Sequence, residues 1–229
     1  QNLYAVISKV SYPVLAELQN DNEILKHTYK RLIKSTMFVT FILMFGLIAL
    51  SDSLIQVLLG DKWMQVTEYL KLMCLTGMMY PLHALNLNLL QVKGRSDLFL
   101  KLEILKKILV VPSIIAGIYF GIKVMLVIMI FNSLIAYYLN SYWSGKFIGY
   151  PMKEQLTDIL PSLLMGLAVM GLMYLVLILI DLNAIYILLI QLIIFFAFTF
   201  GFSELIKLNE YNYLKNTIIN AFKQRYNRI

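Results

Sequence analysis

The sequence has a single cysteine, two histidines and few charged side chains. Cys74 has no second cysteine in the sequence, which excludes an intrachain disulfide. His27 and His83 are far apart in the sequence, and neither belongs to a cluster with the spacing of a metal site. The sequence therefore predicts neither a bound metal nor a cofactor.

Charged residues make up only 14% of the 229 residues, whereas hydrophobic residues make up 60% and the mean hydropathy is +0.74. Soluble domains carry about 25% charged residues. A transmembrane helix needs about 20 mostly apolar residues. Six segments meet or approach that length, although the third is charged in its first turns: 35–51, 72–92, 98–120, 124–145, 159–180 and 182–202. The sequence predicts an all-α integral membrane protein, a polytopic bundle of six full transmembrane helices.

The flanks of this bundle have a different character. Residues 1–16 resemble the end of an earlier helix, and the first residue is Gln1. We therefore expect a truncated chain whose amino-terminal half is missing. Residues 1–31 are predicted to be the end of a preceding helix and a cytoplasmic loop, 32–202 the bundle, and 203–229 an amphipathic cytoplasmic tail.

The net charge of +7 predicts an orientation in the membrane. When the predicted spans are assigned to alternate sides, 20 basic residues divide unevenly: all but Lys62, Lys71 and Lys123 fall on one side. Basic residues near transmembrane helices favour the cytoplasmic side. We expect a multi-pass protein of the bacterial inner membrane with a cytoplasmic carboxy terminus. The charge indicates contact with anionic membrane lipid and not with nucleic acid.

The loops are too short to hold a catalytic domain. The longest external one is predicted over "SDSLIQVLLGDKW" (51–63), where Ser53 is expected to cap a short interfacial helix that closes at Gly60. Gly94 is expected to end the second span in a left-handed conformation, and Ser96 to cap the third. The sequence therefore argues against an enzyme.

The third span carries the strongest site signal. At 100° per residue, Glu103, Lys106 and Lys107 fall on one face, while Lys101 points the other way. Two interpretations remain open. In the first, Glu103 pairs with a lysine one turn away and the lysines extend to the interface. In the second, the face lines a water-filled cavity that attracts an anion.

Under the second interpretation, two more groups join the site. Arg95 would lie at the mouth of the cavity and attract the same anion. On the fourth span, Asn132, Tyr137 and Asn140 occupy one half of the helix, where their amide and hydroxyl groups would line a sugar path. The alternative for these three residues is packing between helices.

Three stretches together resemble a known family. They are "KVSYPVLAELQNDNEILKHTYKRLIK" (9–34), "VLLGDKW" (57–63) and "NLLQVKGRSDLFLKLEILKK" (88–107). In this order they are similar to the Wzx-type polysaccharide and lipopolysaccharide exporters (flippases), in the branch of colanic-acid exporter-like proteins. These belong to the multidrug/oligosaccharidyl-lipid/polysaccharide superfamily. The resemblance runs from residue 1 to about 160.

The resemblance implies a two-lobed transporter of 12–14 helices, of which this chain is the carboxy-terminal lobe. It also implies transport of an undecaprenyl-pyrophosphate-linked oligosaccharide from the inner to the outer leaflet by alternating access, coupled to an ion such as H⁺ or Na⁺. The family fixes no catalytic residue, so the site residues above rest on helix geometry.

Two other functions remain open. A cation-coupled multidrug antiporter of the same superfamily would place unpaired carboxylates in its cavity, whereas the charges here are mostly basic. A non-transport membrane protein of glycan assembly would need a larger external loop.

Overall fold

The computed structural model describes residues 2–180 and 182–205, and within them every regular element is a helix. The elements are α1 (Asn2–Glu17), α2 (Asn22–Leu59), η1 (Asp61–Trp63), α3 (Val66–Gly77), α4 (Tyr80–Val92), α5 (Ser96–Phe120), α6 (Ile122–Ile148), α7 (Met152–Leu179) and α8 (Ala184–Leu205). The predicted all-α fold is confirmed. The amphipathic tail predicted over 203–229 lies almost wholly outside the described residues.

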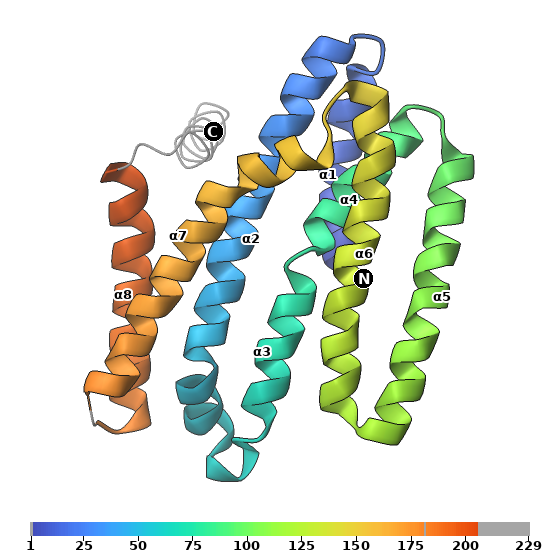
Figure 1. Ribbon diagram of the computed structural model, residues 1–229. Helices are drawn as coiled ribbons and strands as arrows, with labels where there is room; N and C mark the ends of the chain where they lie inside the picture. The colour runs from blue at the N-terminus through green and yellow to red at the C-terminus, as the bar shows by residue number, and fades with distance from the viewer. Residues whose placement is uncertain (1, 181, 206–229) are drawn as a thin grey trace, which may run out of the picture.

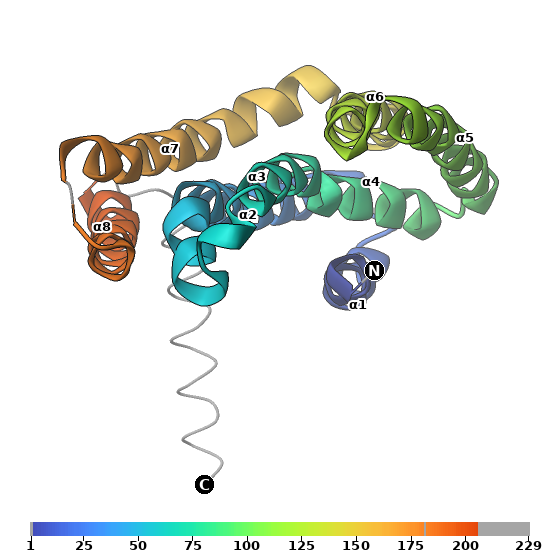
Figure 2. The ribbon, with the colours of Figure 1, turned by 90° about the horizontal axis from the view of Figure 1, so that it is seen from below.

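The helices form two layers (Figures 1 and 2). One layer contains α7, α6 and α5, and the other contains α8, α2, α3 and α4. Helix α1 lies outside the second layer and packs against α4. The contacts between layers are made by α2 with α7 at one side and by α3 and α4 with α6 at the other. Helix α5 packs mainly on α6 and also contacts α4.

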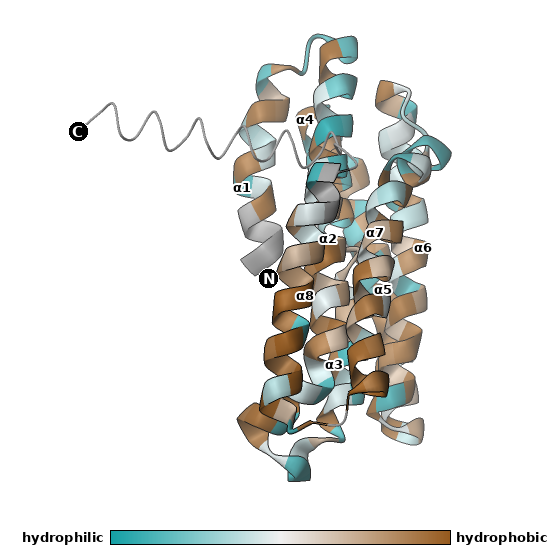
Figure 3. Cartoon of the chain, turned by 90° about the vertical axis from the view of Figure 1, so that its left-hand side faces the viewer, coloured by the Kyte–Doolittle hydropathy of each residue, from teal (hydrophilic) through white to brown (hydrophobic). Residues whose placement is uncertain are grey.

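Four helices are long and apolar enough to cross a membrane: α2, α6, α7 and α8. Helix α5 has 25 residues, but its first half is charged, and α3 and α4 are short. The polytopic membrane fold is therefore supported, while the number of six full spans stays a prediction. Hydrophobic residues make up most of α8 and much of α7 (Figure 3).

Helix α2 is longer in both directions than the sequence predicted. It begins at Asn22, because the Asp21 carboxylate accepts hydrogen bonds from the backbone N–H groups of Glu23 and Ile24 at 3.0 Å. It continues through the stretch predicted as an external loop and ends before Gly60. Ser53 is therefore not a cap. Its hydroxyl is buried inside the bundle and donates to Gln191 Oε1 at 2.9 Å, a partner that the local sequence did not reveal.

The predicted span 72–92 is divided into α3 and α4 at Met78 and Met79. Pro81 explains the break, since it lacks the backbone N–H that would bond to the Gly77 carbonyl. Helix α4 is the most enclosed helix of the bundle, with every residue from 81 to 90 buried. From Pro81 on, α4 therefore runs through the interior of the protein.

Tight turns join the antiparallel helices around α5. Gly94 has φ 68° between α4 and α5, which confirms the predicted left-handed position. Gly121 has φ 89° between α5 and α6. Ser96 is not the cap that the sequence predicted: α5 starts after Arg95 without a side-chain capping bond. The two short turns hold α5 antiparallel to both neighbours.

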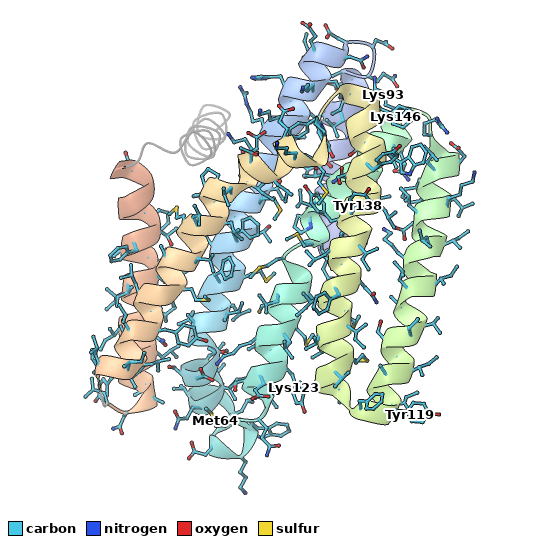
Figure 4. The ribbon with its side chains drawn as sticks, viewed as in Figure 1. Met64, Lys93, Tyr119, Lys123, Tyr138 and Lys146 are labelled. Carbon is cyan, nitrogen blue, oxygen red and sulfur yellow. The ribbon has the colours of Figure 1, made fainter. Side chains whose placement is uncertain are left out.

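The two ends of the bundle differ in charge. Lys93 and Lys146 lie at one end, and Met64, Tyr119 and Lys123 lie at the other (Figure 4). At the first end, Lys30 of α2 forms ion pairs with Glu154 and Asp158 of α7, at 3.1 and 2.9 Å. We call this end the basic end.

Candidate functional site

A cavity of about 1040 Å³ lies between α3, α4, α5 and α6. Pockets that hold small molecules measure about 300–1,000 Å³, so this one has room for a sizeable ligand. Six of its lining residues are apolar: Leu87, Phe99, Leu109, Val110, Met129 and Ala136. The others are polar or charged, which makes the cavity amphiphilic.

The charged side chains of the cavity all come from α5. Glu103, Lys106 and Lys107 line it together, as the helical spacing predicted. Lys106 forms an ion pair with Glu103, one turn away. Lys107 makes no ion pair with any residue in the part of the chain that the structure describes, and it is solvent-exposed. Because one of two ammonium groups is neutralised, the cavity keeps about one excess positive charge.

The structure shows one feature of each interpretation of the α5 face, while attraction of an anion stays a prediction. The pairing of Glu103 with Lys106 is the first interpretation, and the position of both lysines on a cavity wall is the second. Lys101 is exposed and does not line the cavity. It supplies a natural comparison for the two lysines that do.

Asn132 of α6 is held in place by α5. Its Nδ2 donates to the Leu109 carbonyl at 2.7 Å and to the Ser113 hydroxyl at 2.8 Å. Both bonds use the amide nitrogen, so the amide oxygen is the group left for a ligand, as an acceptor. Asn132 lines the cavity, as its prediction as a sugar contact requires.

A buried hydrogen-bond network forms the wall opposite α5. His83 of α4 lines the cavity, and its Nε2 lies 3.1 Å from the Ser133 hydroxyl on α6. Its Nδ1 lies 3.3 Å from Nδ2 of Asn140, also on α6. Asn140 is fully buried and its Oδ1 is without a hydrogen-bond partner. The network thus connects the cavity wall with an unsatisfied acceptor behind it.

Two predicted sugar contacts do not line the cavity. Asn140 lies behind His83 and does not line the cavity. Tyr137 is buried, and its hydroxyl lies 3.4 Å from Gln155 Oε1 on α7. Their roles as sugar contacts stay predictions. In this structure both residues contact other helices.

Arg95 is separated from the cavity. Its guanidinium donates two hydrogen bonds of 2.9 Å to the Asp97 carboxylate and lies 5.4 Å from the centre of the Phe147 ring. Phe147 packs against an apolar cluster of α4 and α5 residues at the basic end: Leu87, Leu90, Leu98 and Leu102. Arg95 is not among the residues that line the cavity, so its role at a mouth stays a prediction. The bond with Arg95 lowers the pKa of Asp97 to about 2.

The sequence reasoning did not assign Tyr80, Phe99 or His83 to the site. Phe99 precedes Glu103 by four residues, so helical spacing alone would have placed it on the same face. Tyr80 has an exposed ring at the break before Pro81, and its ring centre lies 6.4 Å from that of His83. Because the helix is interrupted at Met78 and Met79, the helical spacing of the sequence could not predict which way the side chains of α4 point.

Comparison with known proteins gives partial matches. Residues 1–68 match a family described as "polysaccharide biosynthesis protein". The lipopolysaccharide biosynthesis protein WzxC of Escherichia coli (strain K12) is 28% identical over 115 residues, which cover 50% of this chain and 23% of WzxC. The teichuronic acid biosynthesis protein TuaB of Bacillus subtilis (strain 168) is 28% identical over 93 residues, 41% of this chain and 19% of TuaB.

A third relative is an uncharacterized membrane protein in the cps region of Klebsiella pneumoniae, 25% identical over 107 residues, which cover 47% of this chain and 22% of that protein. No solved structure matches the chain. The matched part thus spans about a fifth of the length of each curated relative. The cavity residues lie outside the range that the family match covers.

These matches agree with the resemblance read from the sequence. The agreement rests on the family match of the amino-terminal residues and on two named relatives from different bacteria. The helical membrane fold is compatible with this resemblance. The chain is therefore similar to membrane proteins of bacterial polysaccharide biosynthesis, and its resemblance to Wzx-type polysaccharide exporters is confirmed.

Proposed function

We propose that this chain is the carboxy-terminal lobe of a flippase that moves a polyprenyl-pyrophosphate-linked oligosaccharide across the bacterial inner membrane. The observation that carries the proposal is the amphiphilic cavity, in which two lysines and an asparagine share a wall with apolar side chains. An anionic head group with attached sugars and a lipid tail has the same division into charged, hydroxylated and apolar parts. The named relatives in polysaccharide biosynthesis support the same substrate class.

Each polar group has a distinct task in this proposal. The ammonium groups of Lys106 and Lys107 attract the pyrophosphate, because charge-assisted hydrogen bonds to phosphate oxygens are strong. Glu103 competes with the anion for Lys106, so it keeps the affinity low enough for release. Asn132 accepts a hydrogen bond from a sugar hydroxyl. No bond in the substrate is made or broken, so the protein is a transporter and not an enzyme.

The remaining parts of the transporter are also proposals. A second lobe would close the cavity, and alternating access of the two lobes would expose it to each leaflet in turn. The basic end would face the cytoplasm, since lysines and arginines favour that side. The excess of basic over acidic charge in the cavity favours an anionic substrate over the cationic drugs of a multidrug antiporter.

A flipping assay tests the proposal. The full-length exporter that contains this chain is reconstituted in liposomes with a fluorescent polyprenyl-pyrophosphate-linked oligosaccharide, and flipping is the fraction of label that an external quencher reaches. Lys106→Gln with Lys107→Gln should slow flipping on the order of tenfold, since a hydrogen bond to a charged group is worth about 1.5–3 kcal/mol.

The matched control neutralises two lysines outside the cavity. Lys101→Gln with Lys153→Gln removes the same charge from exposed positions and should leave flipping near the wild-type rate. Unimpaired flipping by the Lys106/Lys107 variant, at a normal amount of protein in the membrane, would disprove the anion role.

A further inference from the structure

His83 lies between two hydrogen-bond partners that determine which ring nitrogen carries the proton when the ring is neutral. Because the amide nitrogen of Asn140 is a donor, the Nδ1 atom that faces it accepts. The proton of the neutral ring therefore sits on Nε2, which donates to the Ser133 hydroxyl. Both ring nitrogens are satisfied, and the ring lies on the cavity wall.

The same partners also suit the protonated ring. A charged imidazole needs an acceptor at each nitrogen, and the Ser133 hydroxyl already provides one. In the structure, Oδ1 of Asn140 has no hydrogen-bond partner. Rotation of the amide by half a turn would place Oδ1, in place of the nitrogen, against Nδ1 of His83. Among the residues that the structure describes, Asn140 makes no other side-chain hydrogen bond that this rotation would break. The site therefore accommodates the neutral and the charged ring without moving a helix.

Burial and the charges around His83 together decide between the two forms. Lys106, Lys107 and Glu103 of α5 line the same cavity, as does Tyr80 of its own helix. The other helices packed on α4 contribute the buried phenols of Tyr29 (α2) and Tyr137 (α6), while Lys9 of α1 is exposed. Burial of the ring opposes its protonation, and the net positive charge of the cavity adds to that effect. An anion bound at the lysines reverses that field.

We propose that His83 is a proton-binding site whose occupation is linked to the anion in the cavity, so that the protein takes up a proton together with its anionic ligand. Linkage is reciprocal: if the anion favours the proton, the proton tightens binding of the anion by the same factor. This inference rests on the proposed function for the identity of the anion. It selects H⁺ as the coupling ion.

The two histidines of the chain make the test direct. The imidazoles of the whole chain, labelled with ¹⁵N at histidine and placed in nanodiscs, are titrated by NMR with and without farnesyl pyrophosphate. That probe carries a pyrophosphate on a short isoprenoid tail. His27 is exposed on α2 and is the internal reference. Lys106→Gln with Lys107→Gln is the matched variant without the anion site.

We expect the probe to raise the titration midpoint of His83 by about one pH unit or more, the usual effect of a nearby opposite charge. The midpoint of His27 should not move, and the double variant should show no rise. Saturable binding of the probe to the wild type with an unchanged His83 midpoint would overturn the linkage and leave the flippase proposal intact. Equal binding of the probe to the wild type and the double variant would show that the two lysines do not bind the anion, and would disprove both the proposed anion site and the linkage.

Discussion

The α2–α7–α8 side of the bundle and the α4–α5–α6 side solve the same packing problem differently. On the first side, helices approach until only glycine fits. A Cβ atom on Gly166 of α7 would lie 2.6 Å from the Phe45 ring and 3.2 Å from the Phe41 carbonyl oxygen of α2. Gly46 of α2 meets the ring of Phe195 on α8 in the same way.

On the second side, the helices leave an open cavity between them. Ser113 of α5 is buried against α6 and Gly117 packs on Met125, yet the turns nearer the basic end carry long charged side chains. A lysine cannot pack between helices as glycine does, because its charge needs water or a partner. The difference teaches that residue size and charge along the contact face, and not overall hydrophobicity, decide which helices pack closely.

The largest stability effect should come from filling the contact between α2 and α7. Gly166→Leu forces a side chain against a backbone carbonyl that cannot rotate away, and overpacking of this kind costs about 1–3 kcal/mol. The thermal midpoint of the purified chain, followed by circular dichroism in one detergent, should fall clearly. Gly171→Leu on the same helix is the control, since nothing lies within 4 Å of its added Cβ.

A smaller effect should follow from removing the polar link to α8. Gln191 is fully buried; it donates to the carbonyls of Ala49 and Met173 and accepts from Ser53. Gln191→Leu removes all three bonds and takes away the acceptor of the buried Ser53 hydroxyl, which should cost about 1–2 kcal/mol. The same melting experiment measures it, with the exposed Gln65→Leu as control. Equal midpoints for the two variants would show that α8 does not depend on this link.

In the cavity half, a polar substitution should alter transport more than folding. Asn132→Leu should change stability by less than about 1 kcal/mol, the usual range for such bonds between membrane helices. It should slow flipping of the glycan-bearing lipid more than flipping of the bare polyprenyl pyrophosphate. If both substrates slow equally, Asn132 does not contact the sugar.

The smallest effect should come from the exposed ion pair at the basic end. Arg95 lowers the pKa of Asp97 from its ordinary value of 3.8 to about 2. The pair therefore stabilises the fold fully above pH 3.8, and the contribution is lost as the pH falls towards about 2. The difference in melting midpoint between wild type and Asp97→Asn should shrink over that interval and in high salt. A difference that persists below about pH 2 would contradict this assignment.

Helical spacing alone predicted that Glu103, Lys106 and Lys107 share a face, and the structure places all three on one cavity wall. The same reasoning grouped Asn132, Tyr137 and Asn140, but these residues contact different helices. Helix α6 contacts α3, α4, α5 and α7, so side chains on one half of its circumference face several different helices. Periodicity gives the direction of a side chain from its own axis and says nothing of what lies there.

The long apolar runs and the scarcity of charge determined by themselves that this chain is a bundle of membrane helices, because a buried backbone in lipid must satisfy its own hydrogen bonds. The sequence also determined which flank of α5 is cationic. Only the tertiary structure decided that this flank lines one cavity together with His83 and Asn132, and that Ser53 reaches Gln191. These contacts join residues far apart in the chain, and their distances follow from how closely whole helices pack, which no local pattern encodes.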